Sequence, residues 1–330
     1  MRRPLSESIG FGLHSEIPPS QVVEVCRRAE AAGFTEIWVS EDCFFRGGIS
    51  TAAIVLQATE RMKVGIGILS AVTRHPAITA MEISTLAGAF PGRVGVGFGT
   101  GLPTWMSQMG LKKKSPLGAL RESLTSVRQL LSGETLNSSD GNFKFEGVSI
   151  NYPTPDVPLY TGVIGPKALK LSGEIADGTI MSVNAGPKYL EAAKAIIQSG
   201  QEVSGRDGVH ELPTYVLCML DKDRARARQV ARSALGFFFE MGGLNLMTES
   251  YGINEQLGDM LSRGGAETVA NEMPDEWIDW FSVAGEPDEV AEGVGRLYDA
   301  GASSVMLAPF PPVDIPVQID FIGESVISKL

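Results

Sequence analysis

Short apolar runs alternate with longer amphipathic segments along the chain, a pattern typical of strands and helices in succession. The run IGFGL at residues 9–13 is of the first kind. After it, Val22, Val25, Cys26 and Ala29 recur at the spacing of one helix face. Extended along the sequence, the pattern predicts eight strands, at residues 9–13, 36–40, 63–69, 93–98, 157–161, 177–181, 212–220 and 304–308.

Helices are predicted between these strands, and proline marks the first turn of several of them. Pro76 begins a helix that extends to about residue 89, and Pro116 begins one that extends to about residue 131. Residues 99–114 are predicted to be irregular, and residues 134–150 to form a polar hairpin. The remaining helices are predicted at residues 20–32, 50–59, from 166, 187–198, 221–263 with breaks at its glycines, and 287–300.

Strands that alternate with helices in this way predict a parallel sheet. Eight of them favour a closed (β/α)8 TIM barrel with insertions over an open doubly wound sheet. No Pro/Ser-rich linker or short repeat divides the sequence, so we expect a single domain over residues 1–330. In such a barrel the chemistry lies at the C-terminal ends of the strands, and those positions are the ones to inspect.

Composition and charge narrow the possible partners. The chain has 28 Lys and Arg against 39 Asp and Glu, a net charge of −11, and a pI near 4.9. Such a protein repels phosphate backbones and anionic lipid, so we expect neither a nucleic acid nor a membrane as partner. A local basic pocket would still be able to hold one anionic small molecule.

The cysteines and histidines argue against a metal centre. Cys26, Cys43 and Cys218 lie far apart, and the three histidines have no metal-ligand spacing, which predicts a reduced, cytoplasmic protein without a metal site. The N-terminal apolar run is too short for a signal peptide, and no apolar stretch is long enough to span a bilayer.

Polar residues follow the first three predicted strands. His14 is a candidate general acid, because an unperturbed histidine has a pKa near neutrality. Glu41 and Asp42 would face the mouth of the barrel, although solvated surface carboxylates would give the same pattern. Arg74 would either bind an anionic group or form a salt bridge at the rim.

Glycines follow the fourth and fifth strands. Gly99 and Gly101 would allow close approach of the backbone to a ring or a phosphate, or would form a tight turn. Gly165 precedes Pro166, so a phosphate could reach the amides of the helix that starts there. An ordinary connection from strand to helix would contain the same residues.

Taken together, five segments resemble the bacterial luciferase-like superfamily of flavin- and deazaflavin-dependent (β/α)8 barrels. They are AGF at 32–34 with IWVSED at 37–42, VGIGI at 64–68, TRHPA at 73–77, PGRVGVGFGTG at 91–101, and GVIGPK at 162–167 with GEIADG at 173–178. The likeness covers residues 9–182 and is weaker beyond them. The chain is most similar to the branch that uses the 8-hydroxy-5-deazaflavin coenzyme F-420, above all to the methylenetetrahydromethanopterin reductases.

This resemblance implies a coenzyme site built largely from backbone. It implies a non-prolyl cis peptide between Gly67 and Ile68, which would back the deazaflavin ring, and places Asp42 where a residue faces the coenzyme. The other implied coenzyme-binding residues are Thr73, Gly99, Gly101, Val163, Ile164, Gly165 and Pro166, of which the last four match the backbone that holds the coenzyme phosphate.

Two departures from the family pattern change the expected chemistry. Many relatives carry an acidic residue where this chain has Leu102, so the sugar-phosphate and alcohol dehydrogenase branches are disfavoured. The methylene reductases carry a glutamate where this chain has His14, so we predict that His14 moves any proton, with Glu41 as the second candidate. The aromatic residues Trp105, Phe44 and Phe98 would line the pocket or belong to the core.

The prediction is therefore an oxidoreductase that transfers a hydride between coenzyme F-420 and a small organic substrate. Two alternatives stay open. One is an FMN-dependent monooxygenase on the same fold, and the other is a flavin- or deazaflavin-binding protein without turnover. Family resemblance also implies a homodimer that packs through the second and third helices.

Overall fold

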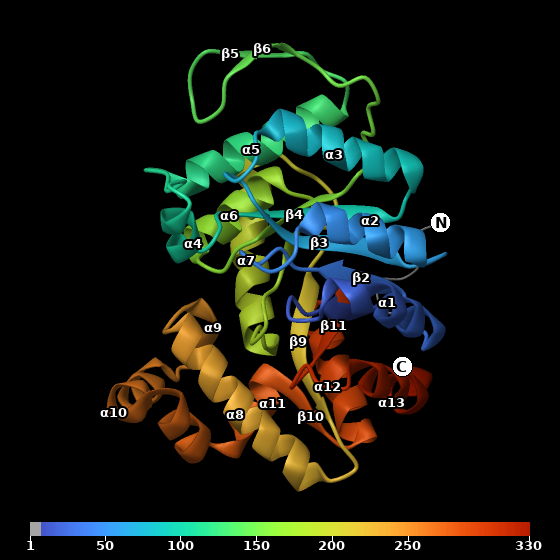
Figure 1. The fold of residues 1–330 in the computed structure, drawn as a ribbon. Coiled ribbons are helices and arrows are strands. Elements are labelled where there is room, and N and C mark those ends of the chain that lie inside the picture. The colour runs from blue at the N-terminus through green and yellow to red at the C-terminus, as the bar shows by residue number, and fades with distance from the viewer. Residues whose placement is uncertain (1–7) are drawn as a thin grey trace.

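A parallel sheet that curls on itself forms the centre of the molecule, with helices around its outside (Figure 1). The computed structural model describes residues 8–330. The first residues of the segment on which the signal-peptide expectation rests, 1–7, lie outside that range. The strands of the sheet are β1 (Ile9–Leu13), β2 (Glu36–Val39), β3 (Lys63–Ser70), β4 (Val94–Gly99), β7 (Leu159–Gly162), β8 (Gly178–Ile180), β9 (Pro213–Leu220), β10 (Ser282–Gly285) and β11 (Ser304–Pro309).

The strand pairing closes eight of these strands into a barrel. Going round, β11 pairs with β1, then come β2, β3, β4, β7 and β8. β8 meets the start of β9 through the parallel bridges Gly178↔Glu211 and Met181↔Thr214, and β9 pairs with β11. The predicted (β/α)8 barrel is confirmed.

The ninth strand, β10, was not predicted. It pairs only with the last four residues of β9, so it extends the sheet beyond the closed barrel. It follows helix α11 (Asp275–Phe281) directly, with no Gly or Pro between helix and strand. Because no turn residue separates these two short elements, the hydrophobic pattern merges them.

Most of the predicted helices begin close to the predicted residues, and α3 (Pro76–Ala89) has the predicted bounds. The segment predicted as helical over 221–263 forms three helices that extend to Glu272, and the helices α11 and Ile315–Ser325 were not predicted. The short helix α4 (Pro103–Gln108) lies within the segment predicted to be irregular. The other helices are η2 (Pro19–Gln21), α1 (Val22–Ala31), α2 (Gly48–Ala58), α5 (Pro116–Leu131), α6 (Pro166–Ile175), α7 (Pro187–Ser204), α8 (Arg224–Gly242), α9 (Leu246–Glu249), α10 (Asn254–Glu272), α12 (Pro287–Asp299), α13 (Ile315–Ser325) and η3 (Ile327–Lys329).

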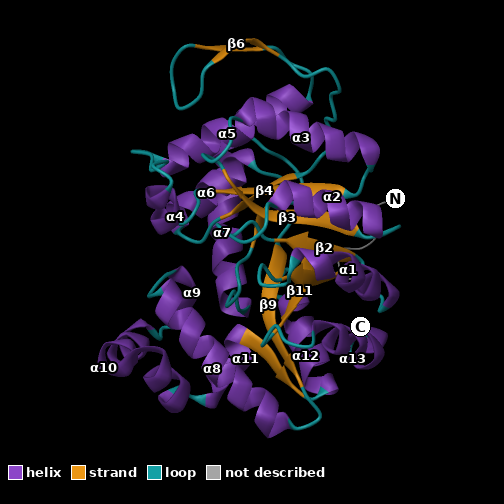
Figure 2. Ribbon diagram, in the orientation of Figure 1, coloured by secondary structure: helices purple, strands orange, loops and turns teal. Residues whose placement is uncertain are grey.

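Two additions lie outside the barrel. The predicted hairpin is formed by β5 (Leu136–Ser138) and β6 (Phe145–Val148), and it lies over α3 and α5, away from the barrel strands (Figure 2). Helices α8, α10 and α11 enclose a second apolar cluster with β9 and β10. Within residues 8–330, no helix is both long and apolar enough to cross a membrane.

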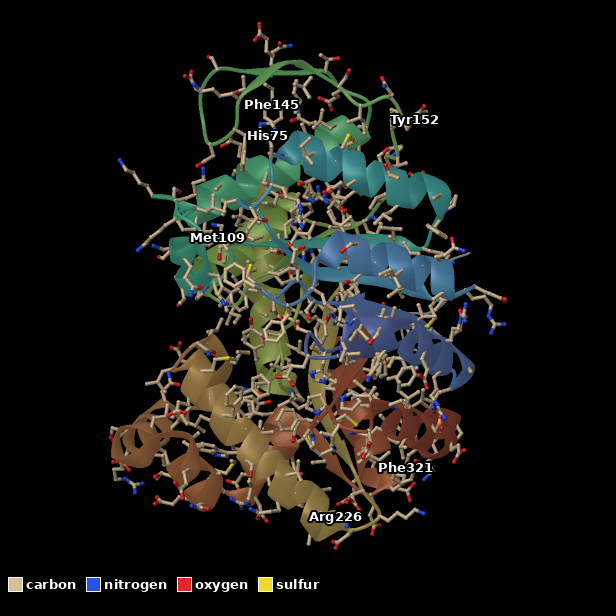
Figure 3. The ribbon with its side chains drawn as sticks, in the orientation of Figure 1. His75, Met109, Phe145, Tyr152, Arg226 and Phe321 are labelled. Atoms are coloured by element: carbon tan, nitrogen blue, oxygen red, sulfur yellow. The ribbon has the colours of Figure 1, made fainter. Side chains whose placement is uncertain are left out.

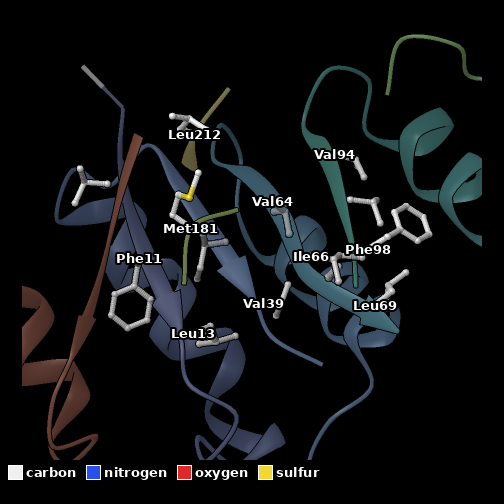
Figure 4. Close-up of a cluster of buried hydrophobic side chains, with 14 of the residues drawn as sticks. Phe11, Leu13, Val39, Val64, Ile66, Leu69, Val94, Phe98, Met181 and Leu212 are labelled. Atoms are coloured by element: carbon white, nitrogen blue, oxygen red, sulfur yellow. The ribbon is translucent and has the colours of Figure 1, made fainter. Parts of the chain in front are cut away.

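The alternation of glycine with large apolar residues sorts the barrel strands into an inner and an outer face. Phe11, Leu13, Ile66 and Phe98 belong to the main apolar core between strands and helices (Figure 4). The glycines between them face inward, where side chains from other strands fill the space that they leave. These inward side chains are Glu36, Trp38, Tyr160, Ile180, Tyr215 and Met306.

A bulge in β3 interrupts this alternation. The pairing of β3 with β4 shifts between Ile66 and Leu69, so that two successive residues, Gly67 and Ile68, both meet inward side chains. The peptide between them is cis, which confirms the linkage that the family resemblance implies. A second non-prolyl cis peptide, Cys43–Phe44, was not predicted.

Candidate functional site

The C-terminal ends of β1, β2, β3, β4 and β7 meet along one rim of the barrel, because these strands are parallel and adjacent. The residues singled out from the sequence follow these ends. Among residues 8–330, no group of three or more His, Cys, Asp or Glu side chains is placed to hold a metal ion.

His14 lies at the end of β1 with a ring nitrogen that is buried and has no partner in the described chain. This nitrogen is Nε2, which makes no hydrogen bond to any described residue. A neutral imidazole has one nitrogen that can accept a proton. Burial lowers the pKa of His14 below its usual value. His14 is thus neutral near pH 7 and offers a proton acceptor.

Glu41 is held by a two-pronged ion pair. Its two carboxylate oxygens accept hydrogen bonds from the Arg74 guanidinium, each at 2.7 Å, and one also accepts from the Gly48 amide at 2.8 Å. Gly48 begins α2, so the carboxylate also lies at the positive end of that helix. Arg74 therefore forms the rim salt bridge that was one of its two expected roles, and a proton-transfer role for Glu41 stays a prediction.

Asp42 ends a short chain of hydroxyl groups. The Ser15 hydroxyl donates to the Asp42 carboxylate, and the Ser40 hydroxyl therefore donates to Ser15 Oγ, at 2.8 Å. The charge of Asp42 acts on the pKa of both His14 and Tyr215, which places the carboxylate near these two groups. The serines come from the ends of β1 and β2, so the chain also ties the two strand ends together.

Arg46, which was not predicted as a site residue, fixes the loop that follows Asp42. Its side chain is buried and donates to the His14 carbonyl at 2.6 Å and to the Leu13 carbonyl at 3.3 Å. Arg46 thereby fastens the β2–α2 loop to the residue that carries the candidate acceptor. No sequence signal separates this arginine from a solvated one.

Packing and backbone conformation explain why residues 99 and 101 are glycines. A Cβ at Gly99 would lie 2.1 Å from Ile68 Cδ1, so the glycine makes room for the side chain at the bulge. Gly101 adopts a left-handed φ of +73°, and a Cβ there would meet Ser70 and Met106. A direct contact of either glycine with a coenzyme stays a prediction.

The ends of β3 and β7 present mostly backbone. Thr73 fixes the turn after β3 by donating its hydroxyl to the Ser70 carbonyl at 3.0 Å. After β7, Val163 and Ile164 lead to Gly165, the N-cap of α6, and Pro166 occupies its first turn. No side chain caps this helix, and a Cβ at Gly165 would meet nothing within 4 Å. This N-terminus is therefore accessible to an anion from the rim side.

Two aromatic or imidazole side chains lie away from the site. Phe98 was considered a possible wall of the pocket, but it is 1% exposed and belongs to the outer core, because the inward positions beside it are Gly97 and Gly99. His75 accepts from the Ala77 amide at the start of α3 and packs edge-on against Phe145 below the hairpin (Figure 3). Neither reaches the inside of the barrel.

The connection after β8 carries a further polar residue, which a rule based on strand ends would have found. Asn184 follows β8, is 5% exposed and has a left-handed φ of 68°, and its Oδ1 has no partner among the described residues. Tyr215 could not be found in this way, because it lies in the middle of β9 and reaches the site only by crossing the barrel.

A family model described as luciferase-like monooxygenase matches residues 5–304. The chain belongs to the luciferase-like monooxygenase family. A family member from Archaeoglobus fulgidus, a 5,10-methylenetetrahydromethanopterin reductase, is 31% identical over 92% of this chain and 93% of its own.

Solved structures of similar proteins share the luciferase-like fold. The coenzyme F-420-dependent tetrahydromethanopterin reductase from Methanopyrus kandleri is 27% identical, with a TM-score of 0.83 over 97% of this chain and 98% of its own. A type II Baeyer–Villiger monooxygenase from Pseudomonas putida, in complex with FMN, has a TM-score of 0.72 over 98% of this chain and 99% of its own, at 16% identity. The second likeness concerns the fold alone.

Proposed function

We propose that this chain is a coenzyme F-420-dependent oxidoreductase that transfers a hydride to or from a small organic substrate of the methylenetetrahydromethanopterin type. The observation that carries the proposal is the 31% identity to a methylenetetrahydromethanopterin reductase over 92% of the chain. The likeness to FMN-dependent monooxygenases is more distant.

The residues at the rim fit a flat, anionic coenzyme. The bulge at Gly67–Ile68 offers backbone on one side of the barrel mouth, and the uncapped α6 N-terminus at Gly165 offers amides to a phosphate. His14 Nε2 and the Tyr215 hydroxyl are buried polar atoms without partners in the described chain, as expected of groups that a ligand completes.

When bound, a deazaflavin supplies a ring carbon that gives or accepts a hydride. The protein's part is to orient the two reactants and keep water out. Asp42 and Arg46 hold the rim loop around His14, and His14 Nε2 accepts or returns a proton if the substrate exchanges one during the reaction. Val163, Ile164, Gly165 and Pro166 would hold the phosphate, Gly67 and Ile68 would back the ring, and Thr73, Gly99 and Gly101 would shape the backbone beside it.

Binding and turnover of the purified chain test this proposal. F-420 and FMN are titrated separately, and reduced F-420 is then mixed with candidate acceptors, methylene-bearing pterins first, while the deazaflavin absorbance is followed. We expect micromolar binding of F-420 and its oxidation by at least one acceptor. Tight binding of FMN with oxygen consumption would instead identify a monooxygenase, and F-420 binding without any turnover would identify a binding protein.

The variant His14→Gln examines the proton-transfer step. It retains a polar side chain but no group that titrates near neutrality. We expect turnover to fall about a hundredfold with F-420 binding nearly unchanged. An equal loss of binding and turnover would place His14 in coenzyme binding rather than in proton transfer.

Assembly as a homodimer in a reducing compartment completes the proposal. Ile54 on α2 and Ile78 and Met81 on α3 are exposed apolar side chains on neighbouring helices, and a second copy would cover them. The three cysteines are free thiols, of which Cys26 and Cys218 are buried, which is in keeping with the cytoplasm.

A further inference from the structure

Tyr215 crosses the inside of the barrel directly below the rim. Its ring edge lies 3.1 Å from the position of a Cβ on Gly12 of β1, and its hydroxyl lies 3.3 Å from that of a Cβ on Gly67 of β3. The side chain starts on β9, on the wall between β8 and β11, and so spans the barrel interior. His14 is the next inward residue of β1 after Gly12, one step nearer the mouth. Tyr215 therefore forms the floor of the candidate site.

The hydroxyl of Tyr215 has no hydrogen-bond partner within residues 8–330, although it is buried. The other tyrosines that are not exposed each have one. Tyr160 donates to Glu211 at 2.6 Å, Tyr189 to the Ile164 carbonyl, and Tyr298 to the Ser8 carbonyl, while Tyr251 accepts from the Lys188 amide. A buried hydroxyl without a protein partner is costly, so a group from outside the protein has to complete it.

The Tyr215 hydroxyl, at the floor of the candidate site, is suited to donate a hydrogen bond. Burial raises the pKa of Tyr215 above its usual range, and the charges of Asp42 and Glu36 act in the same direction, so the hydroxyl keeps its proton. A protonated phenol beside the bulge at Gly67 suits an acceptor atom on a ligand that rests there.

We propose that Tyr215 is a coenzyme-contacting residue whose hydroxyl donates a hydrogen bond to a polar atom of the bound deazaflavin. This inference rests on the proposed function. It adds to that function a side chain from β9, across the barrel from the backbone segment of β3.

The conservative variant Tyr215→Phe removes only the hydroxyl. The matched control is Tyr160→Phe, which removes a partnered hydroxyl from the same internal cluster. Thermal unfolding of the coenzyme-free proteins and F-420 binding by fluorescence are measured on both. We expect Tyr215→Phe to unfold at or above the wild-type temperature and to bind F-420 about tenfold more weakly. We expect Tyr160→Phe to unfold earlier and to bind F-420 as the wild type does.

The other possible results of these measurements separate a wrong coenzyme contact from a wrong proposed function. If Tyr215→Phe binds F-420 as tightly as the wild type, the contact does not exist while the proposed function stands. If Tyr215→Phe loses as much thermal stability as Tyr160→Phe or fails to fold, the hydroxyl has a structural partner and the inference is overturned. Wild-type protein that binds no F-420 overturns the proposed function and this inference together.

A measurement on the wild type avoids dependence on the variant. Labelling the ring carbon that bears the hydroxyl gives up to six tyrosine signals. One buried tyrosine signal should move when F-420 is added, and this signal should be missing from the spectrum of Tyr215→Phe. A spectrum in which every tyrosine signal stays in place would contradict the contact.

Discussion

The ion pair between Glu41 and Arg74 engages a carboxylate that is also the second candidate for proton transfer. Both oxygens of Glu41 are bonded to Arg74, and the side chain of Glu41 is only 11% exposed. A pair so placed is expensive to break, because the partner that remains is left charged and partly buried. The structural role of Glu41 can therefore be separated from a chemical one by substitution.

For Glu41→Gln we expect a loss of about 2 kcal/mol in unfolding free energy, measured by urea denaturation, with turnover within about threefold of the wild type. Glu82→Gln is the control, because Glu82 Oε2 lies 3.7 Å from Arg74 Nε, farther than the oxygens of Glu41. Removal of the Glu82 charge should lower the unfolding free energy by less than about 1 kcal/mol. Turnover reduced a hundredfold at unchanged stability would show that Glu41 takes part in proton transfer.

His210 makes stability depend on pH. It closes a buried chain of hydrogen bonds that runs from Thr161 through Ser172 to Thr179 Oγ1, which lies 2.8 Å from His210 Nε2. Burial is the main cause that lowers the pKa of His210 to about 4 from the usual 6.5. The folded state therefore binds this proton less readily than the unfolded state does.

The pKa of His210 is lower in the folded than in the unfolded state, so neutral His210 contributes fully to the unfolding free energy above pH 6.5. This contribution is lost as the pH falls from 6.5 to about 4. The loss is about 3 kcal/mol at most. In His210→Gln, which cannot titrate, the unfolding free energy measured by urea denaturation should fall by about 3 kcal/mol less over this pH range than it does in the wild type, so its slope against pH is smaller. An identical slope in variant and wild type would mean that His210 titrates normally in the folded protein.

At the scale of elements, the start of α6 separates helix stability from anion binding. Its N-cap Gly165 has φ −78° and ψ 157°, which any residue adopts, and open space in front of it. For Gly165→Asp we expect stability to stay or rise by a few tenths of a kcal/mol, since Asp caps helices better than Gly. Affinity for F-420 should fall at least tenfold, because the carboxylate occupies the amides and repels a phosphate.

Gly165→Ala is the control for this prediction. It adds bulk without charge and should leave F-420 affinity within about threefold of the wild type. Calorimetric titration with F-420 and thermal unfolding provide the two readouts. If the aspartate variant retains wild-type affinity, the phosphate binds elsewhere.

The sequence predicts elements well where their ends carry chemical signals. Pro76 at the first turn gives α3 its start, and the glycines beside Phe11 and Phe98 contain the alternation that sorts inner from outer residues. That alternation could have placed Phe98 in the outer core from the sequence alone. β10 was missed because nothing marks the boundary with α11.

The site is less predictable than the fold because its residues meet through closure of the barrel. Tyr215 reaches Gly12 and Gly67 only when β9, β1 and β3 take up their places around the ring, and no local pattern contains that register. Arg46 likewise finds the His14 carbonyl through the loop that joins β2 to α2. His14 and Asp42 come shortly after strands, so the rule that barrel chemistry lies at strand ends was enough to predict them as site residues.

For the whole molecule, exposed apolar side chains on α2 and α3 support the proposed subunit interface. Ile78 and Met81 are 47% and 51% exposed, and they lie on one face of α3 three residues apart. In the proposed homodimer we expect a mass near 70 kDa, twice the 35.2 kDa of one chain, by light scattering. The double variant Ile78→Glu with Met81→Glu should be monomeric, since charges are costly to bury in an apolar interface. Val203→Glu, which replaces an apolar residue of α7 that is 68% exposed, should remain a dimer. A monomeric wild type, or a dimer that survives the double substitution, would remove α3 from any subunit interface.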